Sequence, residues 1–310
     1  MKIFVLGAGV QGTVFGVRLA QRGHQVTLAA RAARMENLRA FGARVHNEQT
    51  SVAATVLMPV VAGLPSDCSA DLCLVTVRRE QLDSVLPSLT HAKEIGKFVF
   101  LVNHGNGSQD MFRLLGKDRV VLAFPGIAGS IEDGVVRYVE IPQQPTVVES
   151  NAVGIVSIFR DAGLSVNRVR NMDAWLQRHA VFITAIAGVL YENDCNPQVL
   201  AKDTRAVRRF IHGVREGWHA LDRMNVAPAP LALRTILCWV PLRFSVDYWC
   251  KLLNSTQGDL YFARHARHAS REMAALASDV RAFANAREMP VLNELLNSID
   301  RYADLSGPQH

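Results

Sequence analysis

The stretch KIFVLGAGVQG, residues 2–12, decides how the first part of this chain folds. A short apolar run leads directly into glycines spaced Gly-x-Gly-x-x-Gly, and the helix-like segment GTVFGVRLAQRG follows. In this context Gly7 permits a tight turn, Gly9 lets the backbone approach a pyrophosphate, and Gly12 lets helix and strand pack closely. We therefore predict a strand, a phosphate-binding turn and a helix whose amino end faces the phosphates.

This glycine turn is the first candidate site. We assign it to dinucleotide binding through six consecutive residues: Gly7, Ala8, Gly9, Val10, Gln11 and Gly12. The alternative interpretation is an ordinary glycine turn that binds nothing.

The end of the second predicted strand, HQVTLAAR, distinguishes the two nicotinamide cofactors. NAD sites usually place an Asp or Glu there to hold the ribose hydroxyls, but this chain has no acidic residue before Glu36. The strand ends instead at Arg31, with Arg34 one helical turn away, and a guanidinium suits a 2′-phosphate. We therefore predict NADP as the cofactor, with Arg31 among its ligands. The alternative is that these arginines are solvated surface charges.

Strand-like runs continue to about residue 170 and then stop. The further runs are TVLMPVVA, ADLCLVTV, GKFVFLVN, DRVVLAFPG and VVRYVEIP. Their alternation with helical patterns predicts an α/β fold in which residues 1–170 form a Rossmann-type, doubly wound parallel sheet that binds NADP. The segment MDAWLQRHAVFITAIAGVLYEND then predicts one long buried helix. We expect residues 171–310 to form an all-α C-terminal domain for substrate binding and dimerisation.

Composition and charge limit the classes of partner. Of 310 residues 49% are hydrophobic and 20% are charged, which suits two globular domains. The net charge of +6 comes from scattered arginines, so we expect a small anionic ligand and no nucleic acid. The start leads into a strand instead of a signal peptide, and the apolar region from Pro230 is interrupted by charges. We therefore expect a cytoplasmic protein without membrane association. Five cysteines without paired short spacing predict reduced thiols and no metal site.

Two further strand ends carry candidate ligands, because ligands of open parallel sheets bind beyond the carboxyl ends of the strands. VTVRREQ places Arg78 at one of them, where it would contact cofactor phosphates. LVNHGNG places Asn103 and His104 at the other, where a hydrogen bond would orient the nicotinamide or the substrate. The alternative for this Asn/Gly cluster is a plain turn without function.

With these motifs the chain resembles the ketopantoate reductase family, NADPH-dependent enzymes that reduce the ketone of 2-dehydropantoate. The resemblance rests on KIFVLGAGVQG, on Arg31 after the second strand, on VTVRREQ and on the Asn-Gly turn region. It continues more weakly through the helical part. It implies a Rossmann domain, an all-helical second domain and a substrate cleft between them.

One departure from the family pattern concerns the proton donor. The resemblance implies a lysine on the first long helix of the second domain, just before an Ala-Val pair. Here Arg178 and His179 precede that pair. Arginine keeps the charge but is a poor proton donor near neutral pH. Lys202 and Lys251 lie outside this motif, so neither replaces the lysine.

Two other positions depart from the pattern as well. Where the family has an asparagine in the Asn-Gly turn, this chain has His104, with Asn103 one residue earlier. The resemblance also implies a substrate-binding glutamate near the start of a late helix. Matching RHASREM to that motif puts Ser270 at the glutamate position, with Glu272 two residues later. The resemblance therefore extends more firmly to the cofactor than to pantoate specificity.

Carbonyl reduction needs a proton donor for the developing alkoxide within hydrogen-bond reach. His104 and His179 are candidates because an imidazole titrates near neutral pH. We assign His104 as the acid, since it follows a strand end, and Arg178 as the group that binds a substrate carboxylate or polarises its carbonyl. His179 is alternatively a helix histidine packed against its neighbours. Glu272 completes the catalytic candidates.

The late helical part holds two ambiguous segments. ARHARHASREM places His265, His268 and Glu272 at helical spacing, as one side of a metal site or as an interface face, and we predict no metal. Aromatic residues crowd the segment before Asn254 and Ser255, which we assign to substrate binding. Aromatic rings at these spacings are usually core or subunit interface. If they line the cleft instead, the substrate is bulkier than a small branched keto acid.

Together these patterns predict an NADPH-dependent oxidoreductase that reduces a 2-oxo acid or related carbonyl compound by hydride transfer in the interdomain cleft. We expect a small anionic carbonyl substrate and a homodimer. One alternative is a non-catalytic NADP-binding protein, and another is a related dehydrogenase with a bulkier substrate.

Overall fold

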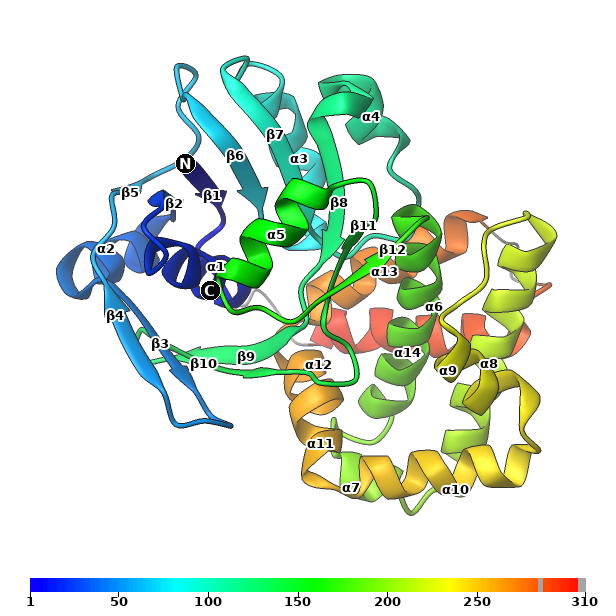
Figure 1. The fold of residues 1–310 in the computed structure, drawn as a ribbon. Coiled ribbons are helices and arrows are strands. Elements are labelled where there is room, and N and C mark those ends of the chain that lie inside the picture. The colour runs from blue at the N-terminus through cyan, green and yellow to red at the C-terminus, as the bar shows by residue number, and fades with distance from the viewer. Residues whose placement is uncertain (284–286, 306–310) are drawn as a thin grey trace. The chain divides into compact units, whose positions relative to one another are not determined.

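The computed structural model describes residues 1–283 and 287–305, and the chain divides into two compact units. The first unit contains residues 1–102 and 108–172. The second contains residues 103–107 and 173–310. The 103–107 loop therefore packs with the helical unit, although it directly follows a strand of the first unit (Figure 1).

A large sheet forms the centre of the first unit, in the order β12-β11-β8-β7-β6-β1-β2-β5. Its strands are β1 (Lys2–Leu6), β2 (Gln25–Ala29), β5 (Val60–Val61), β6 (Ala70–Val75), β7 (Ile95–Leu101), β8 (Val120–Phe124), β11 (Thr146–Glu149) and β12 (Val166–Val169). All neighbouring pairs are parallel except β8 and β11. Strand order runs outward in both directions from β1 and β6, so the carboxyl ends of these two strands form a topological switch point.

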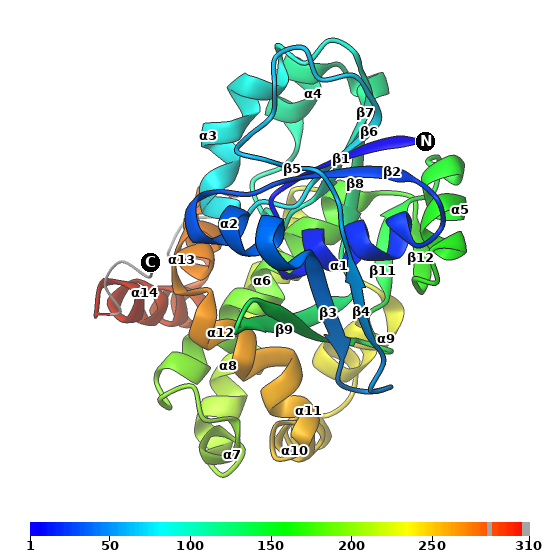
Figure 2. The same ribbon diagram turned by 90° about the vertical axis from the view of Figure 1, so that its left-hand side faces the viewer.

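Helices cover both faces of this sheet. They are α1 (Val10–Ala20), α2 (Ala32–Phe41), α3 (Arg79–Leu89), α4 (Gln109–Leu115), the short η1 (Lys117–Arg119) and α5 (Val153–Asp161). Figure 2 shows α3 and α4 on one side of the sheet and α1 and α5 on the other. Phe15 of α1 and Phe159 of α5 are both fully buried, and their rings lie 5.0 Å apart. The Rossmann-like, doubly wound fold expected from the sequence is confirmed.

A second, smaller sheet was not expected from the sequence. It has the order β4-β3-β10-β9 and consists of β3 (Ala43–Asn47), β4 (Ala53–Val56), β9 (Ile127–Glu132) and β10 (Val135–Glu140). The run TVLMPVVA, expected as one strand, is split between β4 and β5 of the two sheets. Leu57 is 80% exposed there, and Pro59 lacks the amide that a continuous strand would need.

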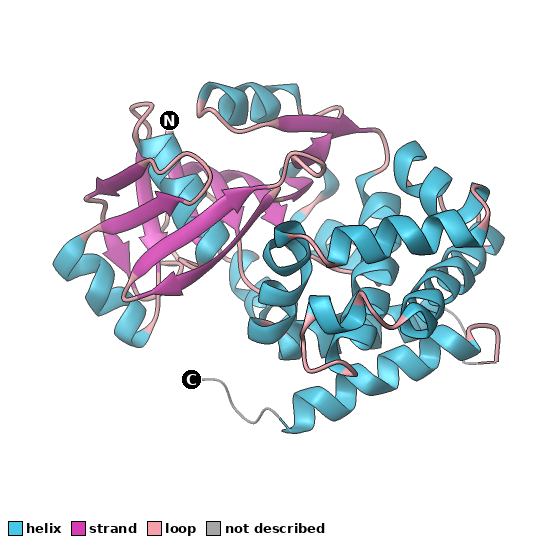
Figure 3. Cartoon of the chain, turned by 90° about the horizontal axis from the view of Figure 1, so that it is seen from below, coloured by secondary structure: helices cyan, strands magenta, loops and turns pink. Residues whose placement is uncertain are grey.

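The second unit is built from helices (Figure 3). They are α6 (Met172–Tyr191), α7 (Pro197–Leu200), α8 (Thr204–Arg223), α9 (Leu231–Arg234), η2 (Thr235–Trp239), α10 (Leu242–Leu253), α11 (Thr256–Gly258), η3 (Asp259–Ala263), α12 (Arg264–His268), α13 (Ser270–Phe283) and α14 (Pro290–Leu305). The long buried helix expected from the sequence is α6, whose residues from Ala180 to Tyr191 are all buried. Within residues 1–283 and 287–305, no helix combines the length and hydropathy needed to cross a membrane.

Candidate functional site

The glycine turn lies at the carboxyl end of β1, beside β2 and β6. Gly7 has a φ of +108°, and an added Cβ would lie 3.0 Å from the Thr76 carbonyl. At Gly12 an added Cβ would overlap the Gly7 carbonyl oxygen. At Gly9, by contrast, an added Cβ would meet nothing within 4 Å. Packing thus requires two of the glycines, whereas the open space at Gly9 is what close approach of a pyrophosphate needs.

Helix α1 presents its amino end at the same place. It begins at Val10 with Gly9 as its N-cap, and its first turn holds no acidic residue. The first amides of a helix have no partner within the helix, and its dipole favours an anion there. The turn and helix together therefore fit the phosphates of a dinucleotide.

Arg31 and Arg78, the expected cofactor ligands, both follow strands that border the glycine turn. Arg31 precedes α2 at the end of β2, and Arg78 precedes α3 at the end of β6. Both residues are exposed. Among the described residues, the Arg31 guanidinium has no hydrogen-bond or ion-pair partner. The structure therefore brings the proposed cofactor residues of the first unit to one edge of the sheet.

Two carboxylates of the second unit lie against the 103–107 loop. The Gly105 amide donates to Oδ2 of Asp279 on α13 at 3.0 Å, and Asp279 is buried. Nε2 of His104 lies 3.8 Å from Oδ1 of Asp173, in the first turn of α6. His104 is only 1% exposed. Sequence reasoning missed both aspartates, because no local motif connects them to a loop so distant in the chain.

Asn103, assigned from the sequence to the cofactor, carries an unusual polar atom. Its Oδ1 is buried and has no hydrogen-bond partner among the described residues. A buried acceptor without a partner costs free energy, so such atoms are rare in native structures. The orphaned oxygen fits a site at which a ligand supplies the donor.

Arg178 belongs to the interior of the second unit. Its guanidinium donates to the carbonyl oxygens of Trp218 (2.7 Å), Val226 (2.7 Å) and Ala227 (3.1 Å), and to the carboxylate of Asp222 (2.6 Å). These bonds use four of its five N–H groups, and the residue is 2% exposed. Arg178 thus joins α6 to the end of α8 and the loop after it. These contacts favour a structural role over the substrate-carboxylate role expected from the sequence, which stays a prediction.

His179 is also a packing residue in this structure. Its ring stacks on Trp175 with centroids 5.0 Å apart and planes 7° apart, and the Phe182 ring lies 6.3 Å away. Burial, together with the nearby His265, lowers the pKa of His179 to about 3. The imidazole is therefore neutral near neutral pH, which favours the packed histidine over the proton donor.

The burial of His179 predicts a loss of stability in mild acid. Unfolding restores an ordinary pKa of 6.5, so between that value and about 3 the unfolded chain binds a proton that the folded chain does not. The contribution of His179 to the free energy of unfolding is therefore complete above its unfolded pKa and decreases as the pH falls below that value. We expect a loss of roughly 2 kcal/mol between about pH 7.5 and about pH 5. Urea denaturation at both pH values measures it.

Two variants test this assignment. His179→Phe keeps an aromatic ring beside Trp175 without a titrating group, and we expect it to remove most of the pH-dependent loss. His219→Phe, at a histidine whose side chain is 72% exposed, should keep the wild-type loss. Equal losses in wild type and His179→Phe would show that His179 is not the group responsible.

Glu272 lies beside His265 in the second unit. Its Oε2 is 3.9 Å from Nε2 of His265 on α12, and its side chain is 12% exposed. Since His265 also lowers the pKa of His179, these three groups gather within the second unit. Asn254 is exposed at the end of α10, and the Ser255 hydroxyl donates to the Leu252 carbonyl at 2.6 Å. Substrate roles for Glu272, Asn254 and Ser255 stay predictions.

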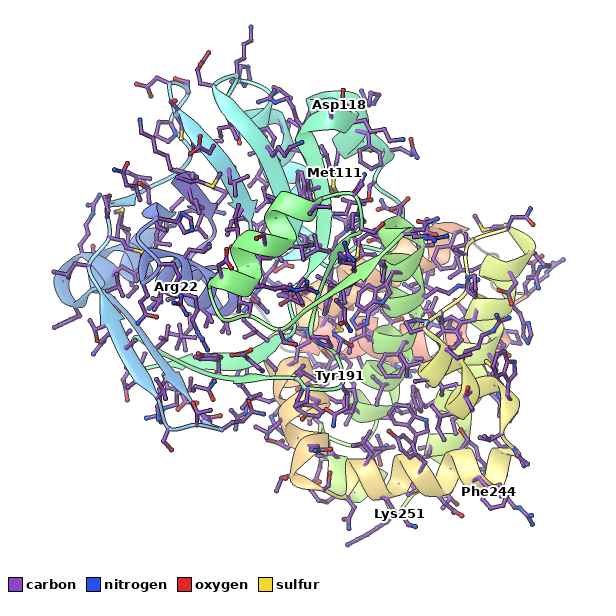
Figure 4. The ribbon with its side chains drawn as sticks, in the orientation of Figure 1. Arg22, Met111, Asp118, Tyr191, Phe244 and Lys251 are labelled. Carbon is purple, nitrogen blue, oxygen red and sulfur yellow. The ribbon has the colours of Figure 1, made fainter. Side chains whose placement is uncertain are left out.

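The aromatic segment before Asn254 divides between core and surface. Trp249 is 2% exposed and packs within the helical core. Trp239, Phe244 and Tyr248 are 58%, 51% and 47% exposed. Figure 4 shows Phe244 pointing outward from α10. One ring in the core and three exposed rings give no support for an aromatic lining around a substrate.

Sequence comparison provides independent information on the first unit. Residues 3–151 match the model of the ketopantoate reductase PanE/ApbA family. A 2-dehydropantoate 2-reductase from Pyrococcus horikoshii is 26% identical over 208 residues, which cover 60% of this chain. The match spans 62% of the length of that relative.

Solved structures resemble the whole chain. A PanE/ApbA family ketopantoate reductase from Ralstonia eutropha JMP134 superposes with a TM-score of 0.79 and 20% identity, covering 99% of this chain and 100% of the other. A D-mandelate dehydrogenase in a ternary structure with NADH and anilino(oxo)acetate has a TM-score of 0.77 and 16% identity, covering 98% of this chain and 99% of the other. At these identities the likeness establishes the fold. Residues 3–151 therefore match the ketopantoate reductase family, as the sequence motifs indicated, and the whole chain shares its fold with a member of that family.

Proposed function

We propose that the protein is an NADP-dependent oxidoreductase that reduces the ketone of a 2-oxo acid or a related carbonyl compound. The observation that carries this proposal is the glycine turn at the switch point, with open space at Gly9. Beyond the neighbouring strand lies the Arg31 guanidinium, which has no partner in the described part of the chain. The names of the similar proteins, 2-dehydropantoate 2-reductase and D-mandelate dehydrogenase, support carbonyl and hydroxyl chemistry. When bound, the nicotinamide cofactor supplies the hydride.

Three groups of the second unit serve the reaction in this proposal. His104 gives a proton to the developing alkoxide, because an imidazole can act as a general acid in carbonyl reduction. Asp173, 3.8 Å from its Nε2, orients the ring and stabilises its protonated form. The unpaired Oδ1 of Asn103 accepts a hydrogen bond from the bound ligand. This arrangement replaces the roles that the sequence suggested for Arg178 and His179.

The choice of NADP over NAD rests on Arg31. We expect Arg31→Ala to weaken NADPH binding at least about tenfold and to leave NADH binding unchanged, since only NADPH carries the 2′-phosphate. Fluorescence titration of each variant with both cofactors measures the two dissociation constants. A wild type that prefers NADH, with no effect of Arg31→Ala on either cofactor, would instead assign the site to NAD.

The proposed reaction is tested by NADPH oxidation with a panel of 2-oxo acids, while cofactor binding is measured in parallel. The panel contains 2-dehydropantoate, a short aliphatic 2-oxo acid and a phenyl-substituted 2-oxo acid. Turnover of 2-dehydropantoate would support the reaction that names the family. Turnover of the phenyl compound alone would support the dehydrogenase with a bulkier substrate. Tight NADPH binding without any turnover would overturn the oxidoreductase in favour of a non-catalytic NADP-binding protein.

A further inference from the structure

The two arginines at the start of α2 make very different contacts, although the sequence suggested the same ligand for both. Arg31 is exposed and its guanidinium is free among the described residues. Arg34 is partly buried and reaches back over the glycine turn. Its Nε donates to the Ala8 carbonyl at 3.0 Å and its Nη2 to Oγ1 of Thr13 at 3.1 Å.

Arg34 also reaches the smaller sheet. Its Nη1 donates to the Gly134 carbonyl at 3.0 Å, in the turn between β9 and β10, and to Oδ1 of Asn37 at 3.4 Å. Each of its three nitrogens is therefore engaged within the first unit. A guanidinium used in this way has little left to offer a 2′-phosphate, which prefers a bidentate partner.

The contact with Ala8 bears directly on the ligand-binding part of the turn. The Ala8 oxygen accepts from Arg34 and also from the Thr13 hydroxyl at 3.2 Å. The Ala8 carbonyl and the Gly9 amide belong to one trans peptide, so the oxygen and the amide hydrogen point in opposite directions. Fixing the Ala8 oxygen therefore fixes the direction of the Gly9 amide, at the residue where the structure leaves space for a ligand.

We propose that Arg34 is a positioning residue, which holds the glycine turn in its binding conformation and does not contact the 2′-phosphate. The inference rests on the proposed function, because it concerns the proposed dinucleotide. It assigns Arg34 to the turn that binds the pyrophosphate and Arg31 to the 2′-phosphate. The pyrophosphate is common to NADPH and NADH, whereas the 2′-phosphate belongs to NADPH alone.

The dissociation constants of both cofactors test the proposal. Arg34→Ala should raise the dissociation constants of NADPH and NADH by the same factor, about tenfold, because both lose the fixed turn. Arg34→Lys should behave like Arg34→Ala, since one ammonium cannot reach the partners that the planar guanidinium joins. If Arg34 bound the phosphate instead, NADPH alone would be affected and lysine would restore much of its binding.

A matched control and a second measurement separate positioning from general destabilisation. Arg39 is exposed on the same helix, and within residues 1–283 and 287–305 it donates only to the Val60 carbonyl, so Arg39→Ala should change neither dissociation constant. Amide hydrogen exchange of residues 2–12 in the cofactor-free protein should be faster in Arg34→Ala and unchanged in Arg31→Ala and Arg39→Ala.

The outcomes are distinguishable. Loss of NADPH binding alone, unchanged exchange in Arg34→Ala, or equal loss in Arg39→Ala would overturn this inference and leave the proposed function intact. A wild type that binds neither cofactor would overturn the proposed function and this inference with it.

Discussion

Arg178→Met is expected to lower the free energy of unfolding by about 3–5 kcal/mol, because it removes a buried cation together with its four hydrogen bonds. Three carbonyl oxygens, those of Trp218, Val226 and Ala227, would lose a donor. The Asp222 carboxylate would lose its ion pair. Methionine fills much of the volume, so the loss reports the hydrogen bonds more than a cavity. Urea denaturation of wild type and variant measures it.

The end of α8 offers a matched control for this prediction. Arg223 is 54% exposed and pairs with Glu288 at 2.9 Å, and Arg223→Met should cost no more than about 1 kcal/mol. The substrate-binding interpretation of Arg178 makes the opposite prediction. Under that interpretation, Arg178→Met would be about as stable as wild type and would have a raised KM for a carboxylate substrate. That combination would restore Arg178 as a substrate-binding residue.

The glycine turn was predictable because its determinants are local. Gly7, Gly9 and Gly12 sit between an apolar run and a helix, and the structural demands on them arise almost entirely from β1, α1 and the adjoining β6. The position of Arg31 follows equally directly from the end of β2. Where the position of a residue depends on its immediate neighbours in the chain, the spacing of residue types was sufficient to predict it.

The roles of Arg178 and His179 were not predictable in this way. The partners of Arg178 lie between Trp218 and Ala227, and nothing in the sequence around α6 indicates that this later segment returns to it. A buried guanidinium with four hydrogen bonds and an exposed one in a binding site look identical in sequence. His179 illustrates the same limit, because its lowered pKa depends on burial and on the distant His265.

The 103–107 loop shows the limit for the candidate site itself. Its strand-end position was evident from the sequence, but its membership of the helical unit was not. Its side-chain contacts within that unit include those with Asp279, which accepts from Gly105, and with Asp173 beside His104. Acidic residues on helices are usually solvated, so neither aspartate had a signal that distinguished it.

His104→Gln is the second change with a large expected effect, and it tests the proposed reaction. Glutamine retains hydrogen-bonding groups but has no titrating proton. If His104 protonates the alkoxide, kcat for the best 2-oxo acid should fall on the order of a hundredfold or more. The dissociation constant of NADPH should stay at the wild-type value, because the glycine turn belongs to the first unit. Steady-state kinetics and cofactor titration of the same preparation measure both quantities.

Asp173→Asn provides the graded comparison. The amide keeps the size of the carboxylate beside Nε2 of His104 but cannot stabilise a protonated imidazole by charge. We therefore expect a smaller fall in kcat, about tenfold. His219→Gln, at an exposed histidine of the same unit, should retain wild-type kinetics. Wild-type turnover in His104→Gln would remove the imidazole from the reaction and leave Asn103 and Glu272 as the polar groups of the second unit to be tested next.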